Sequence, residues 1–306
     1  MGPVSFSRLL TAAGLILVLG GVLYFYAPAR LAALVLIGRS PDCPFSQAVR
    51  SAGEHRRLGQ VKDEILAASR EVEKDPAGYH LWETPKGRFW MPAGSDFVLP
   101  FNLAEQVRKI YGTRETAVRS GDIVLDCGAN VGVYTRDALD AGARLVVAIE
   151  PAPENLECLR RNFAAEVAAR RVVVYPKGVW DKDDFLTLNV DPNNSAADSF
   201  LIQREGSQSV LKVPLTTIDK LVRELNLERV DLVKMDIEGA EPNALAGATE
   251  TLTRFKPRLT ISAYHAPDHP RVIPAKIRAI RADYRMECGP CAEANQGVRP
   301  DILYFF

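Results

Sequence analysis

Hydrophobic positions divide the chain into two parts with different patterns. Residues 9–29 carry no charged side chain, and small, aliphatic and aromatic residues make up nearly all of them. From residue 79 onward, short apolar runs alternate with stretches in which apolar residues recur every three or four positions. The runs predict buried strands and the spaced stretches predict amphipathic helices. Strands that alternate with helices are typical of a mostly parallel sheet covered on both faces.

The same pattern gives the approximate positions of these elements. The predicted strands are 123–125, 144–149, 172–175, 185–190, 210–215, 230–235, 259–264, 284–288 and 302–306. The predicted helices are 103–111, 153–163, 217–225, 244–252 and 274–281. Alternating residues on both sides of a Pro/Gly turn at 84–87 also predict a hairpin ahead of the main sheet, over residues 79–91.

The uncharged segment 9–29 has the length of a membrane-spanning helix, which needs about 20 apolar residues. Tyr24 and Tyr26 lie near its end, where aromatic side chains favour the membrane interface. A cleaved signal peptide is the alternative, but its apolar core is usually shorter. A buried helix of a globular domain is expected to have a polar face, which this segment lacks. We therefore expect an N-terminal transmembrane helix.

This expectation divides the chain into three parts. Residues 1–40 are predicted to form a membrane anchor, residues 41–78 a connector with a helix over 46–74, and residues 79–306 the main domain.

Basic residues near the span indicate its orientation. Arg8 precedes the span, whereas Arg30, Arg39 and Arg50 follow it. Because basic residues collect on the cytoplasmic side, this small excess favours a single-pass membrane protein with a cytoplasmic main domain.

Charge and cysteine content bear on the class of function. The 306 residues contain 38 basic and 38 acidic side chains, whereas general nucleic-acid binders normally have a basic excess. Five cysteines in a chain of this length are not a disulfide framework. Cys288 and Cys291 form a C-x-x-C pair without the second pair that a zinc site needs, so we expect a turn with two free thiols. Cys127 and Cys158 are expected to be buried and inert.

A glycine-containing turn directly follows the predicted strand at 123–125. It has the pattern D-x-G-x-N-x-G, formed by Asp126, Gly128, Asn130 and Gly132. Glycine permits a sharp turn and the close approach of a ligand to the backbone. The dinucleotide fingerprint G-x-G-x-x-G needs a glycine where Asn130 stands, so the turn does not match a pyrophosphate site.

A carboxylate follows the next predicted strand at the spacing expected for ribose recognition. Glu150 lies about 20 residues after the glycine turn. S-Adenosylmethionine has a ribose and an amino-acid end but no phosphate, so it suits this arrangement. Asp126 would then bind its ammonium group and Glu150 its ribose hydroxyls. The alternative is an ordinary turn between a strand and a helix, with a helix-capping residue.

The loop after the strand at 172–175 lies where the adenine of such a cofactor is expected. It contains Val179, Trp180 and Asp181. Val179 or Trp180 could pack on the adenine ring, and Asp181 could accept a hydrogen bond from the adenine amino group. A position for Trp180 in the hydrophobic core is equally compatible with the sequence.

An acidic turn follows the strand at 230–235, which is apolar enough for a central parallel strand. Asp236, Glu238 and Glu241 lie at its end, where open α/β sheets place their chemistry. They could orient a substrate hydroxyl, take its proton or hold a metal ion. Glu241 could instead cap the following helix. His265 follows the next predicted strand at the same edge and is a further candidate for the general base.

Together these motifs resemble those of the FkbM family of S-adenosylmethionine-dependent methyltransferases. The similarity covers roughly residues 80–306, and it includes T-T-I-D at 216–219 and K-x-D-I-E-G-x-E at 234–241. The resemblance implies a class I methyltransferase fold, which is an α/β, Rossmann-like, doubly wound sheet, mostly parallel with an antiparallel last strand. It also implies methyl transfer to oxygen, often on a sugar hydroxyl.

These observations predict one reaction and leave two alternatives. The acceptor oxygen attacks the methyl carbon in line with the departing sulfur, and Asp236, Glu238 or His265 removes the proton. The residues expected to contact S-adenosylmethionine are Asp126, Gly128, Asn130, Gly132, Glu150, Val179, Trp180 and Asp181. The expected partners are a small-molecule or glycan acceptor and a membrane; neither a metal ion nor nucleic acid is expected. The alternatives are a nicotinamide-dependent oxidoreductase and a membrane-tethered binding module without catalysis.

Overall fold

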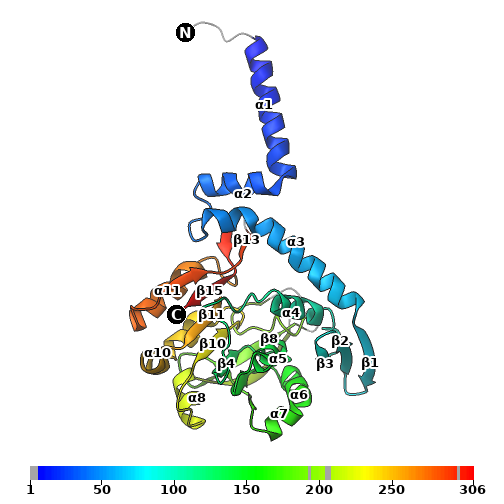
Figure 1. The fold of residues 1–306 in the computed structure, drawn as a ribbon, viewed down its shortest axis with the longest axis vertical. Coiled ribbons are helices and arrows are strands. Elements are labelled where there is room, and N and C mark those ends of the chain that lie inside the picture. Colours follow the sequence, from blue (N-terminus) through cyan, green and yellow to red (C-terminus); the bar gives the residue numbers. More distant parts are fainter. Residues whose placement is uncertain (1–5, 192–193, 204–207, 295–296) are drawn as a thin grey trace.

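Three helices precede the main domain in the computed structural model, which describes residues 6–191, 194–203, 208–294 and 297–306 (Figure 1). α1 (Phe6–Phe25) points away from the rest of the molecule, and α2 (Ala27–Leu36) lies across its end. α3 (Phe45–Ala67) then runs along the main domain. These helices correspond to the predicted anchor and connector, whose boundaries stay predictions.

The predicted single helix over residues 9–29 is two helices. α2 has Pro28 in its first turn, and a proline cannot donate the backbone hydrogen bond that would continue α1. In the described part of the chain, no helix alone is long and apolar enough to cross a membrane. Residues from Ala13 to the end of α1 meet this criterion only in combination with α2, across a bend of 106°.

The core of the main domain is a seven-stranded sheet with the order β12-β15-β11-β10-β4-β5-β6. Its strands are β4 (Ile123–Cys127), β5 (Leu145–Ile149), β6 (Val172–Tyr175), β10 (Leu232–Met235), β11 (Arg258–Ser262), β12 (Met286–Cys288) and β15 (Ile302–Phe305). β6, β5, β4, β10 and β11 are parallel, and β15 is antiparallel to both β11 and β12. All side chains of β4 and β10 are buried, as expected of central parallel strands. The predicted mostly parallel α/β sheet is confirmed.

Helices cover both faces of this sheet. They are α4 (Val98–Val107), α5 (Val133–Asp140), α6 (Pro153–Asn162), α7 (Ala164–Ala168), α8 (Ile218–Glu224), α9 (Glu241–Ala246), α10 (Thr249–Phe255) and α11 (His269–Ile280). Successive strand side chains point to opposite faces. Val124 therefore packs with α5 and α6, whereas Leu125 packs in the cluster that contains α8 to α11. Because helices cover both faces, the sheet is doubly wound.

Smaller sheets surround the main one. Their strands are β1 (Arg70–Asp75), β2 (Tyr79–Thr84) and β3 (Gly87–Pro92); β7 (Gly178–Val179), β9 (Gln208–Thr216) and β8 (Asp184–Val190); and β13 (Cys291–Ala294) with β14 (Gly297–Pro300). The β2–β3 hairpin is confirmed. The predicted helix over 46–74 is too long, because Glu71 and its neighbours pair with Trp82 of β2 instead. The helix predicted over 244–252 is divided into α9 and α10.

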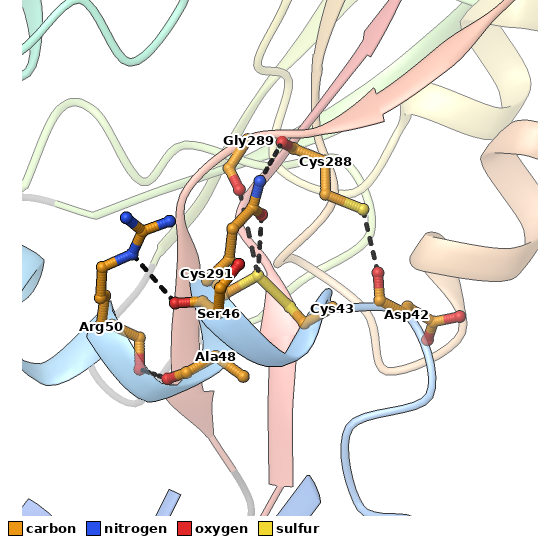
Figure 2. The surroundings of a disulfide bond; sticks show 10 residues. Asp42, Cys43, Ser46, Ala48, Arg50, Cys288, Gly289 and Cys291 are labelled. Carbon is orange, nitrogen blue, oxygen red and sulfur yellow. Dashed lines mark hydrogen bonds between the residues drawn. A yellow bond between two sulfur atoms is a disulfide. The ribbon is translucent and has the colours of Figure 1, made fainter. Parts of the chain in front are cut away.

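A disulfide bond joins Cys43, just before α3, to Cys291 at the start of β13 (Figure 2). The prediction of two free thiols in the C-x-x-C pair is therefore wrong for Cys291. Its partner is 248 positions away in the sequence, so local spacing did not indicate the bond. Cys288 is a free thiol and donates to the Asp42 carbonyl oxygen at 2.9 Å. Cys127 is free and buried as predicted, and burial raises the pKa of its thiol.

Candidate active site

The carboxyl ends of four parallel strands meet at one edge of the sheet. Cys127 of β4 pairs with both Ile149 of β5 and Met235 of β10, and Met235 pairs with Ile261 of β11. The segments after these strands therefore start close to the same level. This register brings together the glycine turn, Glu150, the acidic turn and His265, as the sequence predicts.

Gly128 and Gly132 are required by close packing as well as by backbone conformation. Their φ angles are 78° and 94°, a region that favours glycine. A Cβ atom on Gly128 would lie 1.9 Å from the carbonyl oxygen of Asp236. A Cβ atom on Gly132 would lie 2.1 Å from the ring of Phe163. Gly128 thus allows the glycine turn and the acidic turn to touch.

Asp126 lies beneath the glycine turn and is fully buried. Its carboxylate accepts a hydrogen bond from the Thr135 hydroxyl at 2.7 Å and lies 3.2 Å from Nζ of Lys234. Lys234 donates to the Gly128 carbonyl oxygen at 2.8 Å. Burial alone would lower the pKa of Lys234, but Asp126 and Asp236 outweigh it and keep the ammonium charged. Asp126 supports the turn through Lys234, and its contact with the cofactor's ammonium group stays a prediction.

Glu150 connects the end of β5 to the glycine turn. Its Oε2 accepts a hydrogen bond from the backbone N–H of Asn130 at 2.8 Å, and its Oε1 accepts one from Ala152 at 2.9 Å. Burial raises the pKa of Glu150 to about 7, although these hydrogen bonds oppose the shift. Glu150 thus ties the end of β5 to the glycine turn, and its contact with a ribose stays a prediction.

A narrow cavity of about 50 Å³, the cofactor cleft, lies between these loops. Gly128, Asn130, Glu150 and Val179 are among its lining residues. The Asn130 side chain donates to the carbonyl oxygen of Ser195 at 3.0 Å. The segment after β8 therefore lies directly over the cleft, and it narrows the space between the glycine turn and Val179.

The three residues predicted to lie near adenine have different positions. Val179 lines the cofactor cleft. Trp180 is buried in a cluster with Leu215, and its ring meets Phe200 edge to face at 6.2 Å. Asp181 is exposed and does not line the cleft. The structure thus gives Trp180 a core position, and Val179 is the one of the three in position to contact a ligand in the cleft.

A larger cavity of about 690 Å³, the reaction cavity, continues from the cofactor cleft. The two share Gly128, Asn130, Asp236 and Glu238. Its other walls include residues of α3, β2, the loop before α4, α4 itself and α5, together with Tyr264. A ligand could therefore extend from the glycine turn to the acidic turn without leaving the cavity.

Asp236 is held by two tyrosines at the wall of this cavity. Tyr111 donates to its Oδ2 at 2.7 Å, and Tyr264 donates to its Oδ1 at 3.2 Å. Burial alone would raise the pKa of Asp236, but the positive charges of Lys234 and His265 outweigh it and hold the pKa below its usual value. Asp236 is thus a fixed carboxylate that is ionised at neutral pH.

His265 lies among three carboxylates. Its Nδ1 is 2.9 Å from Glu241, and its Nε2 is 3.3 Å from Glu238 and 3.5 Å from Asp236. Glu241 is fully buried at the start of α9 and also accepts a hydrogen bond from the backbone of Ile237 at 3.0 Å. Glu241 therefore both stabilises the acidic turn and orients His265.

This environment determines the charge of His265. Burial alone would lower its pKa, but Glu238 and Glu241 outweigh that effect and raise the pKa to about 10. The side chain is therefore an imidazolium at neutral pH. An imidazolium has no free lone pair for a proton, so His265 does not fit the predicted role of general base in this arrangement. Asp236 and Glu238 fit that role better.

The same cluster could hold a divalent cation. Asp236, Glu238 and His265 each offer one ligand atom, and these atoms lie within 4.8 Å of one another. Oxygen and imidazole ligands suit several divalent ions. The expectation that no metal takes part stays a prediction.

Several residues of the site do not belong to any motif of the sequence. Tyr111 and Tyr264 hold Asp236, and Glu105 of α4 lines the reaction cavity. Tyr264 directly precedes His265, so its position just after β11 could have identified it as a site residue. Tyr111 and Glu105 come from a segment before the main sheet, where helical spacing shows only which face is apolar.

Residues 126–286 match the Methyltransferase FkbM domain, which is more than half of the chain. The chain belongs to the FkbM methyltransferase family. The resemblance found in the sequence motifs is thereby confirmed, and the family implies S-adenosylmethionine as the methyl donor.

Known relatives of this FkbM-family chain share low identity with it. The 31-O-demethyl-FK506 methyltransferase FkbM of Streptomyces tacrolimicus is 26% identical in an alignment of 160 positions, and the match covers 44% of this chain and 62% of that protein. The 2-O-methyltransferase NoeI of Sinorhizobium fredii is 28% identical over 152 residues, which are 44% of this chain and 60% of that protein. The chain thus spans less than two thirds of the length of these relatives.

Solved structures resemble the chain more distantly. Methyltransferase FkbM from Methylobacillus flagellatus is 18% identical with a TM-score of 0.49, and the match covers 85% of this chain and 60% of that one. An S-adenosylmethionine-dependent O-methyltransferase from Thermotoga maritima is 13% identical with a TM-score of 0.36, covering 74% and 76%.

The residues at the sheet edge fit S-adenosylmethionine. Gly128 and Asn130 line both cavities, so one ligand can run along the glycine turn from one cavity to the other. Asn130, Glu150 and Val179 would contact the adenosine part at the cofactor cleft, where Ser195 would have to move aside because a space of about 50 Å³ is smaller than an adenosine. The methionine part would then extend past Gly128 toward Asp236 in the reaction cavity.

Proposed function

We propose that this protein transfers a methyl group from S-adenosylmethionine to a hydroxyl oxygen of a sugar or glycan. The observation that carries the proposal is Asp236, an ionised carboxylate fixed by Tyr111 and Tyr264 at the wall of the reaction cavity. The glycine turn opens into the same cavity. A fixed carboxylate is the group that a neutral hydroxyl needs, because it orients the oxygen and accepts its proton.

The reaction needs alignment and proton removal. When bound, S-adenosylmethionine supplies an activated methyl group on a cationic sulfonium. Asp236 accepts a hydrogen bond from the acceptor hydroxyl and takes its proton as the new oxygen–carbon bond forms, with Glu238 as the alternative acceptor. His265, as an imidazolium, places a positive charge beside these carboxylates and helps to hold the pKa of Asp236 below its usual value. Because no step requires a divalent ion, activity is expected to persist in the presence of a chelator.

The lining of the reaction cavity supports a sugar acceptor. Trp82 and Phe101 present aromatic surface, and Asp96, Asn102 and Glu105 present hydrogen-bonding groups. Flat apolar surface beside polar groups matches a sugar ring, which has both apolar C–H faces and polar hydroxyl edges. The 2-O-methyltransferase NoeI is an O-methyltransferase by name, and that activity is compatible with this lining.

A binding measurement separates this proposal from the two alternatives. Calorimetry should detect binding of S-adenosylhomocysteine and no binding of NAD; the reverse result would favour the oxidoreductase. A panel of simple glycosides with radiolabelled S-adenosylmethionine then tests turnover. Binding of S-adenosylhomocysteine without transfer to any saccharide would contradict sugar methylation.

We also propose that residues 1–40 attach the main domain, residues 79–306, to a membrane. α1 exposes a large apolar surface, with Leu17 76% and Phe25 85% exposed. Exposed apolar surface of this extent is unfavourable in water. Full-length protein should therefore sediment with membranes after gentle lysis, and a variant without residues 1–40 should not. Equal recovery of both in the supernatant would contradict attachment.

The redox state of Cys43 and Cys291 tests on which side of the membrane the main domain lies. The basic residues after α1 favour a cytoplasmic domain, whereas a disulfide bond persists in oxidising compartments. Alkylation of intact cells followed by mass spectrometry should show whether Cys43 and Cys291 carry the alkyl group. If the domain is cytoplasmic, the Cys43–Cys291 bond of the structure is reduced in the cell and both thiols are alkylated; an unmodified, disulfide-linked pair would contradict that placement.

A further inference from the structure

A third cavity opens beside the reaction cavity and has no role in the reaction described above. It has a volume of about 370 Å³ and lies between α3, α4 and the β13–β14 hairpin. We call it the hairpin cavity. His55 of α3, Arg108 of α4 and Arg299 of β14 are on its walls, together with Asp301.

The hairpin cavity adjoins the place where the acceptor oxygen reacts. Phe101, Glu105 and Tyr264 line both it and the reaction cavity. Tyr264 is also one of the two tyrosines that donate to Asp236. The cofactor cleft, in contrast, shares no lining residue with the hairpin cavity. The two cavities are therefore neighbours across these three side chains, on the side of Asp236 away from the cofactor cleft.

Two polar groups of this cavity lack partners within the described chain. No hydrogen bond or ion pair joins the half-buried Glu105 side chain to another described residue. The Nε atom of Arg299 is buried and likewise finds no hydrogen-bond partner among the described residues. A buried donor or acceptor without a partner is unfavourable, so these groups favour a ligand that offers both.

We propose that the hairpin cavity binds the second sugar unit of a glycan acceptor while the first unit is methylated at Asp236. The inference rests on the proposed function and adds that the acceptor has at least two sugar units. Both carboxyl groups and guanidinium groups line the cavity, beside the ring of Phe101. This mixture suits a neutral polyhydroxylated ligand, whereas a lipid chain would leave Glu105 and the Nε atom of Arg299 without hydrogen-bond partners.

The disulfide bond stabilises the walls of this subsite. Cys291 lines the cavity, and its bond to Cys43 ties the hairpin to the start of α3 (Figure 2). α3 also reaches the reaction cavity, where Lys62 and Leu66 are lining residues. One helix thus borders both sugar positions, and the hairpin that closes the second position is linked to it covalently.

The test fills the hairpin cavity without touching Asp236 or the cofactor cleft. His55→Trp places a larger side chain on the cavity wall. Arg56→Trp is the matched control, because Arg56 is the next residue of α3, is exposed and lines none of the three cavities. Each variant is assayed with methyl glycosides of common hexoses and 6-deoxyhexoses, and with disaccharides that carry the same sugars at the non-reducing end.

Wild-type protein should have a kcat/KM for a disaccharide roughly tenfold or more above that for the matching monosaccharide, about the effect of one well-made hydrogen bond. His55→Trp should remove this preference and leave the monosaccharide rate and S-adenosylhomocysteine affinity unchanged. Arg56→Trp should keep the preference. Equal wild-type rates on both acceptors, or an equal loss on both in His55→Trp, would overturn the subsite alone. Intact cofactor binding without transfer to any saccharide would overturn the proposed function and the subsite together.

Discussion

The cofactor side and the acceptor side of this protein are built in different ways. On the cofactor side, Gly128, Asn130 and Glu150 follow two neighbouring strands and lie within 23 positions of one another. On the acceptor side, Lys62, Phe101 and Tyr264 come from segments far apart in the sequence. Asp236 lies between the two sides and lines both cavities. The cofactor side is therefore set by two neighbouring strands of the sheet, whereas the acceptor side depends on how segments far apart in the sequence pack together.

The largest expected effect is at the residue shared by both sides. Asp236→Asn should keep the shape of the side chain but remove the charge that accepts the proton. Turnover should fall by about 10²–10⁴-fold, the usual contribution of a positioned acid or base, while cofactor affinity stays near normal. Single-turnover kinetics with radiolabelled S-adenosylmethionine measures the effect. Asp181→Asn, an exposed position outside the cavities, is the control, and a folded Asp236→Asn protein with near-normal turnover would disprove the assignment.

A smaller but more general effect is expected at Gly128. Gly128→Ala adds a Cβ atom that would meet the Asp236 carbonyl oxygen at 1.9 Å, so the two turns must separate. The free energy of unfolding should fall by roughly 1–3 kcal/mol, as for other overpacked sites, and cofactor affinity should fall with it. Urea unfolding and calorimetry measure both quantities.

Gly78→Ala separates the two causes of this effect. Gly78 also has a positive φ, 88°, but has no atom within 4 Å of an added Cβ. It therefore reports the backbone cost alone and should leave cofactor affinity unchanged. If both variants lose the same stability and neither loses affinity, close packing at Gly128 does not shape the site.

Glu150→Ala should affect the cofactor side alone. Loss of a charge-assisted hydrogen bond to the ribose weakens binding by roughly 1.5–3 kcal/mol. Calorimetry with S-adenosylhomocysteine gives the affinity directly, and the preference between monosaccharide and disaccharide acceptors should not change. Unchanged affinity in a folded protein would show that Glu150 only ties the two loops together through Asn130 and Ala152.

The smallest expected change is in the pH dependence at saturating substrates. A histidine general base with the ordinary pKa of 6.5 would make kcat rise through that pH. Because the pKa of His265 is raised to about 10, its proton is retained and no such rise is expected. The rate should instead decline as the pH approaches 10, when the imidazolium that balances Asp236 and Glu238 is lost. A kcat profile that rises near pH 6.5 in wild type but not in His265→Gln would restore the base role to His265.

The sequence was sufficient for the elements of the sheet and for the position of the turn residues after β4. Apolar runs such as residues 172–175 coincide with β6, and the turn residues after β4 are close in sequence, so spacing alone places them. It could not decide between a core and a ligand-facing position for Trp180, because both kinds of position at a strand end take the same residue type. It also treated residues 9–29 as one straight helix, since hydrophobicity does not show a bend at Tyr26.

The acceptor side could not be predicted to the same extent. β13 and β14 are short, and their residues lack a clear alternation, so they have no strong strand signal. The Cys43–Cys291 bond depends on α3 lying against that hairpin, which is a tertiary contact. The charge of His265 likewise depends on Glu238 and Glu241 surrounding it in space, although its position after β11 was predictable.

The most direct test of the central claim is to identify the methylated product. Wild-type protein is incubated with S-adenosylmethionine that carries a trideuterated methyl group and with the glycoside and disaccharide panel. Mass spectrometry with fragmentation then locates the label. We predict one labelled methyl ether on a hydroxyl oxygen of the terminal sugar, formed at a rate that Asp236→Asn greatly reduces. Label on a nitrogen atom, or no labelled saccharide from a protein that binds S-adenosylhomocysteine, would contradict the account.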